Sequence, residues 1–206
     1  MFTNEESIEI CKRNMFKEEH IIYLNKPPKE KKSDYNFKRL LQNDYIEQFQ
    51  AIRLGIFYQK YLRNIVHDSG IATLYDENLV QLFEKTKIKN KGKKDVDLCF
   101  IIDKNIYYFE VKTNLYLDTE KTYVSDKKMR LLSQYISDEY KDYNLISGCL
   151  TGWYEYEKGM TVRPHGNVVY MGEFYSLIKL IMKKEDHMDL LLELGTKIKP
   201  YKKVSK

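Results

Sequence analysis

Two short apolar runs separated by a polar break restrict the fold of this chain more than any other feature. Val96–Ile102 and Ile106–Val111 flank the polar Asp103–Asn105 break, a pattern that predicts a β-hairpin. Three charged residues interrupt these runs or follow them directly: Asp97, Glu110 and Lys112. A charge buried in a strand is costly unless a partner or a metal compensates it. We therefore expect these side chains to pair with one another or to bind an ion.

The alternation of side chains along a strand determines which of these charges meet. Glu110 and Lys112 share a face, because successive residues of a strand point to opposite faces. A turn of even length, whether two residues (104–105) or four (103–106), would pair Asp97 with Lys112 and place it diagonal to Glu110 on the same face. A three-residue turn would put Asp97 on the other face unless a bulge corrected the register.

Two carboxylates and a lysine that share one face suit the hydrolysis of phosphate esters. Paired carboxylates bind hard cations such as Mg²⁺, which keep several of their waters. The ion lowers the pKa of a bound water and neutralises charge on a phosphoryl oxygen, and a neighbouring lysine can orient that water. The hairpin is therefore a candidate site for metal-assisted cleavage of a phosphodiester.

The spacing of these residues resembles a known active-site motif. Asp97, twelve further residues and then Glu110-Val111-Lys112 are similar to the motif of the PD-(D/E)XK nucleases, the superfamily that includes most type II restriction endonucleases. The resemblance implies that Asp97, Glu110 and the backbone carbonyl of Val111 bind Mg²⁺ and that Lys112 is the catalytic lysine. Val96 stands where the motif often has proline, so the match departs from the pattern there.

Two alternatives stay open at this point. The hairpin could be an ordinary amphipathic one, with a solvated polar face and a surface Glu110–Lys112 pair. Asp95 could replace Asp97 as the first metal ligand, but it lies nearer the basic 91–94 turn. It also lies one strand pair beyond Lys112 in the favoured register, so we prefer Asp97.

The composition fits one soluble domain. The chain has 206 residues, a formal net charge of +5 and a pI near 8.8, a mild basicity that is compatible with nucleic-acid binding. No apolar stretch approaches the roughly eighteen residues of a membrane span, and the acidic N-terminus does not resemble a secretory signal. Three widely spaced cysteines without a CxxC pair favour a reducing cytoplasm. We expect a cytoplasmic protein with no membrane partner.

The rest of the chain is expected to surround the hairpin with helices in a single nuclease domain, 1–206. Residues 1–42 form an N-terminal section with a helix at 8–19 and a proline-containing linker, 43–182 the catalytic core with recognition loops, and 183–206 a C-terminal helix and basic tail. Further helices are expected at 44–66, 78–85, 119–140, 173–182 and 185–194, and strands at 71–75, 145–154 and 168–170. The predicted fold class is α/β, in the mixed α+β sense. It has a PD-(D/E)XK restriction-endonuclease-like core in which helices flank a central mixed β-sheet.

Other residues are weaker candidates for the site. Glu47, on the first long helix, could add a carboxylate to the metal site, although a solvent-facing charge in a first helical turn explains it as well. Basic side chains near the start of the 119–140 helix oppose its dipole, which a DNA phosphate would compensate, although a plain solvated face explains them equally well. Aromatic or arginine side chains near the C-terminus could stack on bases or read them, although a simple surface turn also explains the arginine. The candidates for DNA contact are Asn114, Lys121, Lys127, Lys128, Trp153, Tyr154, Arg163 and His165.

These features lead to a functional expectation. We expect a Mg²⁺-dependent type II restriction endonuclease that hydrolyses a specific double-stranded DNA sequence, acting as a homodimer because two-fold symmetry matches a palindromic site. One alternative is another PD-(D/E)XK nuclease, such as a junction resolvase, a repair nuclease or a phage nuclease. A second alternative is a non-catalytic basic DNA-binding protein in which the hairpin is merely structural.

Overall fold

A computed structural model describes residues 2–26, 41, 48–71, 96–112, 119–156 and 167–199, without the side chains of 48–49 and 119–125. The proline-containing linker and the helix expected at 78–85 lie outside these ranges. The same is true of the strand expected at 71–75, apart from its first residue. The description that follows concerns the described residues alone.

A four-stranded mixed sheet forms the centre of the structure, in the order β1-β2-β3-β4. The hairpin strands β1 and β2 are antiparallel, whereas β3 runs parallel to β2 and β4 runs parallel to β3. The strands are β1 Leu98–Ile102, β2 Asn105–Val111, β3 Asn144–Leu150 and β4 Asn167–Val169. The helices around them are α1 Asn4–Met15, α2 Glu18–Asn25, α4 Gln48–Asp68, α6 Thr119–Glu139, α7 Met171–Leu177 and α8 Lys184–Lys197. The predicted mixed sheet flanked by helices and its β-β-α-β order are confirmed.

The hairpin turn lies one residue earlier than expected. Ile102 pairs with Asn105, so the turn consists of Asp103 and Lys104. Asp103 has φ of +53°, a left-handed conformation that aspartate tolerates better than most residues. Continuing this register by one residue sets Asp97 opposite Glu110, so the predicted pairing of Asp97 with Lys112 is wrong. The turn still has an even length, and the two carboxylates therefore still share a face.

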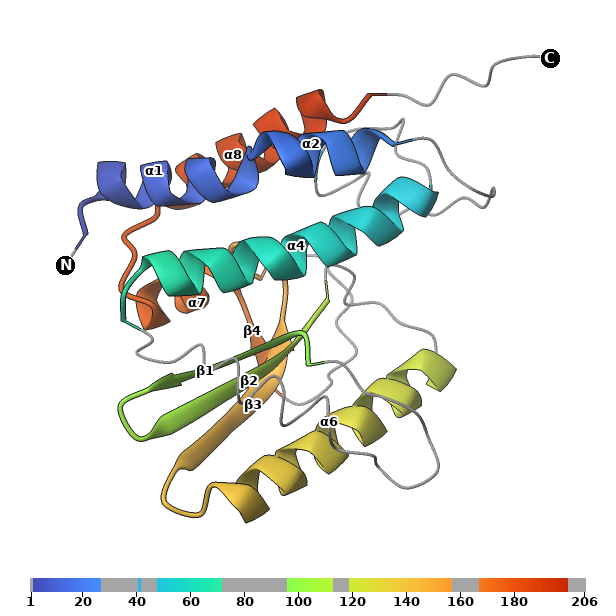
Figure 1. Cartoon of the computed structure of the whole chain (residues 1–206), viewed down its shortest axis with the longest axis vertical. Coiled ribbons are helices and arrows are strands. Elements are labelled where there is room, and N and C mark those ends of the chain that lie inside the picture. Colours follow the sequence, from blue (N-terminus) through green and yellow to red (C-terminus); the bar gives the residue numbers. More distant parts are fainter. Residues whose placement is uncertain are drawn as a thin grey trace.

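Each face of the sheet packs against a different helical layer. Figure 1 shows α6 on one side of the sheet and α4 on the other. On the α6 side, Cys99 and Tyr108 pack with Leu132 and Ile136 of that helix. On the other side, the intervening strand residues join the core built around α4 and α7: Leu98, Phe100, Phe109 and Val111. The hairpin is thus buried on both faces, and any charge along it needs a partner.

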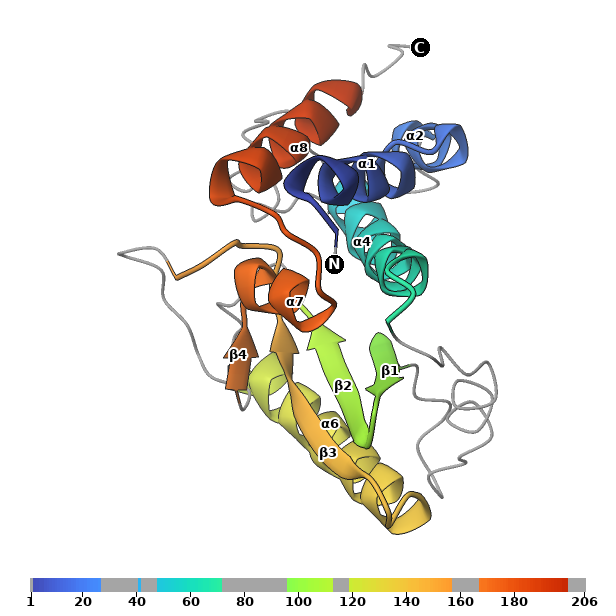
Figure 2. The same cartoon turned by 90° about the vertical axis from the view of Figure 1, so that its left-hand side faces the viewer.

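The remaining helices cover the outer side of α4. Both α1 and α2 contact α4, and α8 contacts α1; Figure 2 shows these three helices grouped beyond α4, away from the sheet. The inner stripe of α4 is fully buried, with Leu54, Tyr58, Tyr61 and Ile65 following helical spacing. This helix therefore connects the outer helical layer to the sheet.

The N-terminal section contains two helices where one was expected. Thr3 caps α1 through a capping box: its side chain accepts a hydrogen bond from the Glu6 backbone N–H, and the Glu6 side chain accepts one from the Thr3 N–H. The helix therefore begins several residues before the predicted start at residue 8. It ends at Met15, and Lys17 has an extended conformation before α2 begins.

The C-terminal part also departs from its predicted boundaries. The third strand ends at Leu150, because the backbone N–H groups of Met171 and Gly172 bind the carbonyls of Trp153 and Tyr154. The segment after the strand thus bonds to the start of α7 and does not extend the sheet. That helix ends at Leu177, short of the predicted residue 182. Among the described helices, none is long and apolar enough to cross a membrane.

Candidate active site

Two carboxylates lie buried at the end of the hairpin opposite its turn, where β1 begins and β2 ends. Asp97 directly precedes β1, and Glu110 is the second-last residue of β2. Only 7% of Asp97 and 4% of Glu110 are exposed. The hairpin register brings the two residues opposite each other, on the face that α6 covers. Their burial makes compensation by nearby positive charge necessary.

Two lysines provide that compensation. The Lys112 Nζ atom lies 2.9 Å from Glu110 Oε1. The Lys128 Nζ atom, from α6, lies 2.6 Å from Glu110 Oε2 and 3.6 Å from Asp97 Oδ1. The second oxygen of Asp97 accepts a hydrogen bond of 3.0 Å from the Val111 backbone N–H. We call Asp97, Glu110, Lys112 and Lys128 the charged cluster.

Electrostatic interactions shift the pKa values of the charged cluster in different directions. Burial raises the pKa of Asp97, and the neighbouring Glu110 raises it further against the opposing effect of Lys128. Burial also acts to raise the pKa of Glu110, but Lys112 and Lys128 outweigh it and the pKa is lowered. Burial acts to lower the pKa of Lys112, and Glu110 reverses this so that the pKa is raised. Perturbed groups of this kind are typical of functional sites.

Lys128 contacts the carboxylates directly, whereas the sequence suggested a DNA contact. Its side chain is 16% exposed, much less than a lysine on a solvated helix face. Lys128 precedes Met129 and lies four residues before Leu132, both of which are buried. Residues four apart share a helix face, so the apolar stripe of α6 was a signal that could have placed Lys128 against the sheet.

Arg63 of α4 contributes to the site from the other side of the sheet. Its Nε atom donates a hydrogen bond of 3.0 Å to the Asp97 carbonyl, and its guanidinium also donates to the Val96 carbonyl. These bonds hold the segment that leads into β1, and so they position the Asp97 side chain. The sequence offered no signal for this role, because the pairing joins residues 34 positions apart.

A buried tyrosine lies beside the charged cluster. Tyr108 is fully buried, and its hydroxyl has no hydrogen-bond partner among the described residues. Burial raises the pKa of Tyr108, and the nearby Glu110 and Asp97 raise it further. An unpaired buried hydroxyl is uncommon and costly. The α6 face of the hairpin therefore holds one polar group that the described contacts leave unsatisfied.

Of the other predicted residues, Lys127, Trp153 and Tyr154 have described side chains, and none of them contacts the charged cluster in the described part of the chain. Lys127 is exposed on α6, next to Lys128. Trp153 packs against the core around α4, and the Tyr154 hydroxyl donates a hydrogen bond of 2.7 Å to the Met182 carbonyl. The backbone of Lys121 lies in α6, but its side chain is not described. The remaining candidates lie outside the described residues: Glu47, Asn114, Arg163 and His165.

The charged cluster has a donor set that suits a hard divalent cation. Asp97 and Glu110 offer carboxylate oxygens and Val111 a backbone carbonyl, which are ligand types that Mg²⁺ accepts. The Lys128 ammonium is a cation that contacts an oxygen from each carboxylate. One positive centre can therefore reach both side chains in this arrangement. The described residues contain no group of three or more His, Cys, Asp or Glu side chains able to hold a metal.

Comparisons with protein-family models, with curated proteins and with solved structures found no match for this chain. The chemistry of the site must therefore be inferred from its own residues. Two buried carboxylates, two lysines and a fixed backbone segment form a site that can bind a cation, neutralise a phosphate and orient a water.

Proposed function

We propose that this protein is a Mg²⁺-dependent DNA endonuclease of the PD-(D/E)XK kind. The observation that supports the proposal best is the convergence of Asp97, Glu110 and Lys112 in one buried cluster. These are the three side chains of the sequence motif, and they contact one another directly or through Lys128. Strand parity alone places Asp97 and Glu110 on one face, so the support for the proposal is the burial of both carboxylates against two lysines.

Each residue of the site has a distinct role in this proposal. Asp97, Glu110 and the Val111 carbonyl would hold Mg²⁺, which when bound supplies charge neutralisation at the phosphate and a more acidic water. Because the pKa of Lys112 is raised, this lysine stays protonated at neutral pH. In this proposal, Lys112 acts as a cation that orients water and stabilises negative charge in the transition state.

Lys128 gives the site a resident counter-ion. Its ammonium occupies one oxygen of Glu110 and approaches Asp97, and so it neutralises carboxylates that are costly to bury as bare charges. A metal held by both carboxylates would compete with Lys128 for these oxygens. The Lys128 ammonium would then be able to contact a phosphate of the substrate.

The finer assignment follows the resemblance of the motif. We propose that the substrate is double-stranded DNA with a specific sequence, that the enzyme acts as a cytoplasmic homodimer, and that it belongs with the type II restriction endonucleases. The mildly basic pI near 8.8 agrees with a polyanionic substrate. Hydrolysis with in-line displacement would leave 5′-phosphate and 3′-hydroxyl ends.

The balance of charge in the cluster favours one other candidate function. Two carboxylates face two lysines, so the cluster could be a buried ion-pair network that specifies the fold of a non-catalytic DNA-binding protein. Under this alternative, loss of Lys112 lowers stability but changes no reaction. The two functions therefore differ in what one substitution does.

Incubation of the purified protein with supercoiled plasmid, with Mg²⁺ or with EDTA, tests the proposal. We expect discrete linear fragments with Mg²⁺ only, uniform ends on sequencing, and no preference for branched over linear duplex. Lys112→Ala should abolish cleavage, whereas Lys104→Ala, at the exposed turn of the same hairpin, should cut like the wild type. Cleavage by Lys112→Ala at the wild-type rate would refute the assignment.

A further inference from the structure

A basic hollow lies between α2 and α4, on the side of the sheet opposite α6. Its volume is about 570 Å³, within the range of small-ligand sites in proteins. Its walls carry four permanent positive charges and one negative charge among the described residues: Lys17, Lys26, Lys60, Arg63 and Glu19. This excess of positive charge makes the hollow attractive to an anion.

The positive charges of the hollow are largely uncompensated. Neither Lys17 nor Lys60 forms an ion pair within the described part of the chain. Burial lowers the pKa of His20 in the wall, against the opposing effects of its hydrogen bond to the Asn14 carbonyl and of Glu19, and the charges of Lys17 and Lys60 add smaller lowering effects. Lys17 and Lys60 therefore lie close enough to His20 to oppose its protonation.

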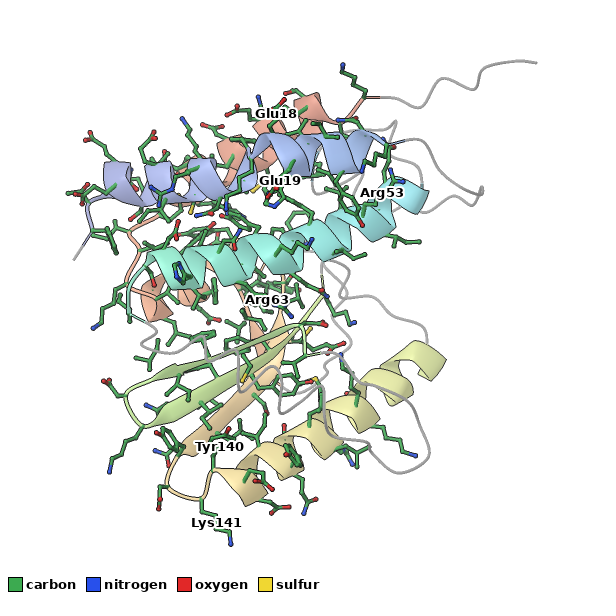
Figure 3. The ribbon with its side chains drawn as sticks, viewed as in Figure 1. Glu18, Glu19, Arg53, Arg63, Tyr140 and Lys141 are labelled. Carbon is green, nitrogen blue, oxygen red and sulfur yellow. The ribbon has the colours of Figure 1, made fainter. Side chains whose placement is uncertain are left out.

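Arg63 connects the hollow to the charged cluster. It lines the hollow, and its guanidinium donates hydrogen bonds to the backbone carbonyls of Val96 and Asp97. Figure 3 shows Arg63 on the side of α4 that faces the sheet and Glu19 on α2. Asp97 therefore contacts Arg63 through its backbone carbonyl and Lys128 through its carboxylate. Arg63 thus links the wall of the hollow to the candidate active site.

The shape and chemistry of the hollow fit phosphate groups of a chain. Phe57 and His20 pack edge to face in its wall, with ring centroids 5.3 Å apart. Lysine ammonium groups bind phosphate without reading bases. A strand bound at the cluster would carry further phosphates, and Arg63, which contacts the Asp97 carbonyl, also lines the hollow.

We propose that the hollow between α2 and α4 binds backbone phosphates of the DNA strand that continues past the charged cluster. This inference rests on the proposed function for the identity of the substrate. Lys17 and Lys60 are the phosphate-binding residues, and Arg63 positions Asp97 while facing the same strand.

Binding of a labelled duplex of about 30 base pairs, followed by fluorescence anisotropy without divalent metal, tests this site in the full chain. Each lost phosphate contact should reduce the slope of log affinity against log salt by about 0.9. The double variant Lys17→Gln/Lys60→Gln should therefore bind at least ten-fold more weakly, with a slope lower by about 2. The charge-matched control is Lys141→Gln/Lys183→Gln, two exposed lysines away from the hollow, and Figure 3 shows Lys141 at the far end of α6. This control should keep the wild-type slope.

Equal slopes for the two double variants would overturn the hollow as a DNA site. Wild-type cleavage with Mg²⁺ in the same preparation would show that the proposed function stands nevertheless. If inorganic phosphate instead stabilises the wild type against heat, but not Lys17→Gln/Lys60→Gln, while DNA binding is unchanged, the hollow binds free phosphate and the DNA assignment is wrong. If the double variant fails to fold, Lys60→Gln alone should show about half the change in slope, because Lys60 is exposed.

Discussion

Two buried polar clusters lie on opposite sides of the sheet, and their chemistry differs. On the α4 side, the Tyr61 and Tyr175 hydroxyls lie 3.3 Å apart, the Tyr175 hydroxyl lies 2.9 Å from His187 Nδ1, and His187 Nε2 lies 2.9 Å from the Gly152 carbonyl. A carbonyl only accepts, so Nε2 carries the proton and Nδ1 accepts from Tyr175. This neutral chain joins α4, α7 and α8 to the segment after β3.

The charged cluster on the α6 side has the opposite properties. Its carboxylates are buried, but the side chains of Lys112 and Lys128 are 29% and 16% exposed, whereas His187 is fully buried. The side chains of the neutral chain bond to one another and to the Gly152 carbonyl. The charged cluster holds costly charges where β1 begins and β2 ends, next to the Tyr108 hydroxyl, which has no hydrogen-bond partner among the described residues. Under the proposed function, we expect the first cluster to serve stability and the second to serve chemistry.

The largest expected effect separates the two clusters by activity. Asp97→Asn removes a charge that would hold the cation, and we expect DNA cleavage with Mg²⁺ to slow by roughly 10³-fold or more, because metal-assisted stabilisation is worth several kcal/mol. Tyr61→Phe, which removes one hydroxyl of the neutral chain, should cut within about two-fold of the wild type. Similar losses in both variants would break the distinction between the clusters.

The next effect separates them by stability. His187→Ala should lower the free energy of unfolding by about 3 kcal/mol, because it leaves a cavity and deprives both the Tyr175 hydroxyl and the Gly152 carbonyl of partners. Denaturant unfolding measures the loss. At a temperature where the variant is folded, its cleavage rate should match the wild type, and a large loss of rate in the folded variant would contradict a purely structural role.

The pH dependence of stability should reveal the same histidine. Burial lowers the pKa of His187 from 6.5 to about 4, so the unfolded chain binds its proton more tightly than the folded one. Stability from this group is fully present above about pH 6.5 and is lost as the pH falls towards 4, by up to about 3 kcal/mol. Unfolding free energies across this range should fall more steeply for the wild type than for His187→Gln. Parallel curves would argue against a neutral buried His187.

A smaller effect concerns Lys128 as the resident counter-ion. Lys128→Met removes one of the two cations beside Glu110, and we expect the metal-free protein to lose about 2 kcal/mol of stability because a buried charge becomes less compensated. Mg²⁺ should restore part of this loss, so that it raises the melting temperature of Lys128→Met more than that of the wild type. Lys127→Met, on the exposed face of α6, is the matched control. An unchanged response to Mg²⁺ would show that Lys128 and the cation do not compete.

The sequence was most informative where local rules decide the outcome. Strand parity and an even turn were sufficient to bring Asp97 and Glu110 to one face, and apolar periodicity located α6 and α4. The exact turn position was not predictable, because Asp103 adopts a left-handed conformation that the sequence pattern did not require. The Asp97–Lys112 pairing failed for this reason.

The sequence pattern could not predict contacts between distant segments of the chain. Arg63 binds the Asp97 carbonyl across 34 residues, and His187 meets Gly152 across 35, so neither role leaves a local signature. Lys128 is an intermediate case. The apolar stripe of α6 could have placed it on the inner face, but only the packing of that helix on the hairpin shows which carboxylates it meets.

The most direct test of the account is the single-turnover rate of cleavage of a plasmid substrate with Mg²⁺ by the wild type, Glu110→Gln and Tyr175→Phe. Glu110→Gln keeps the shape of the side chain but removes its charge, and Tyr175→Phe removes one hydroxyl from the neutral chain. The account predicts that Glu110→Gln cuts at least about 10³-fold more slowly, whereas Tyr175→Phe cuts at close to the wild-type rate. Wild-type cleavage by Glu110→Gln, or a wild type that does not cut DNA at all, would contradict it.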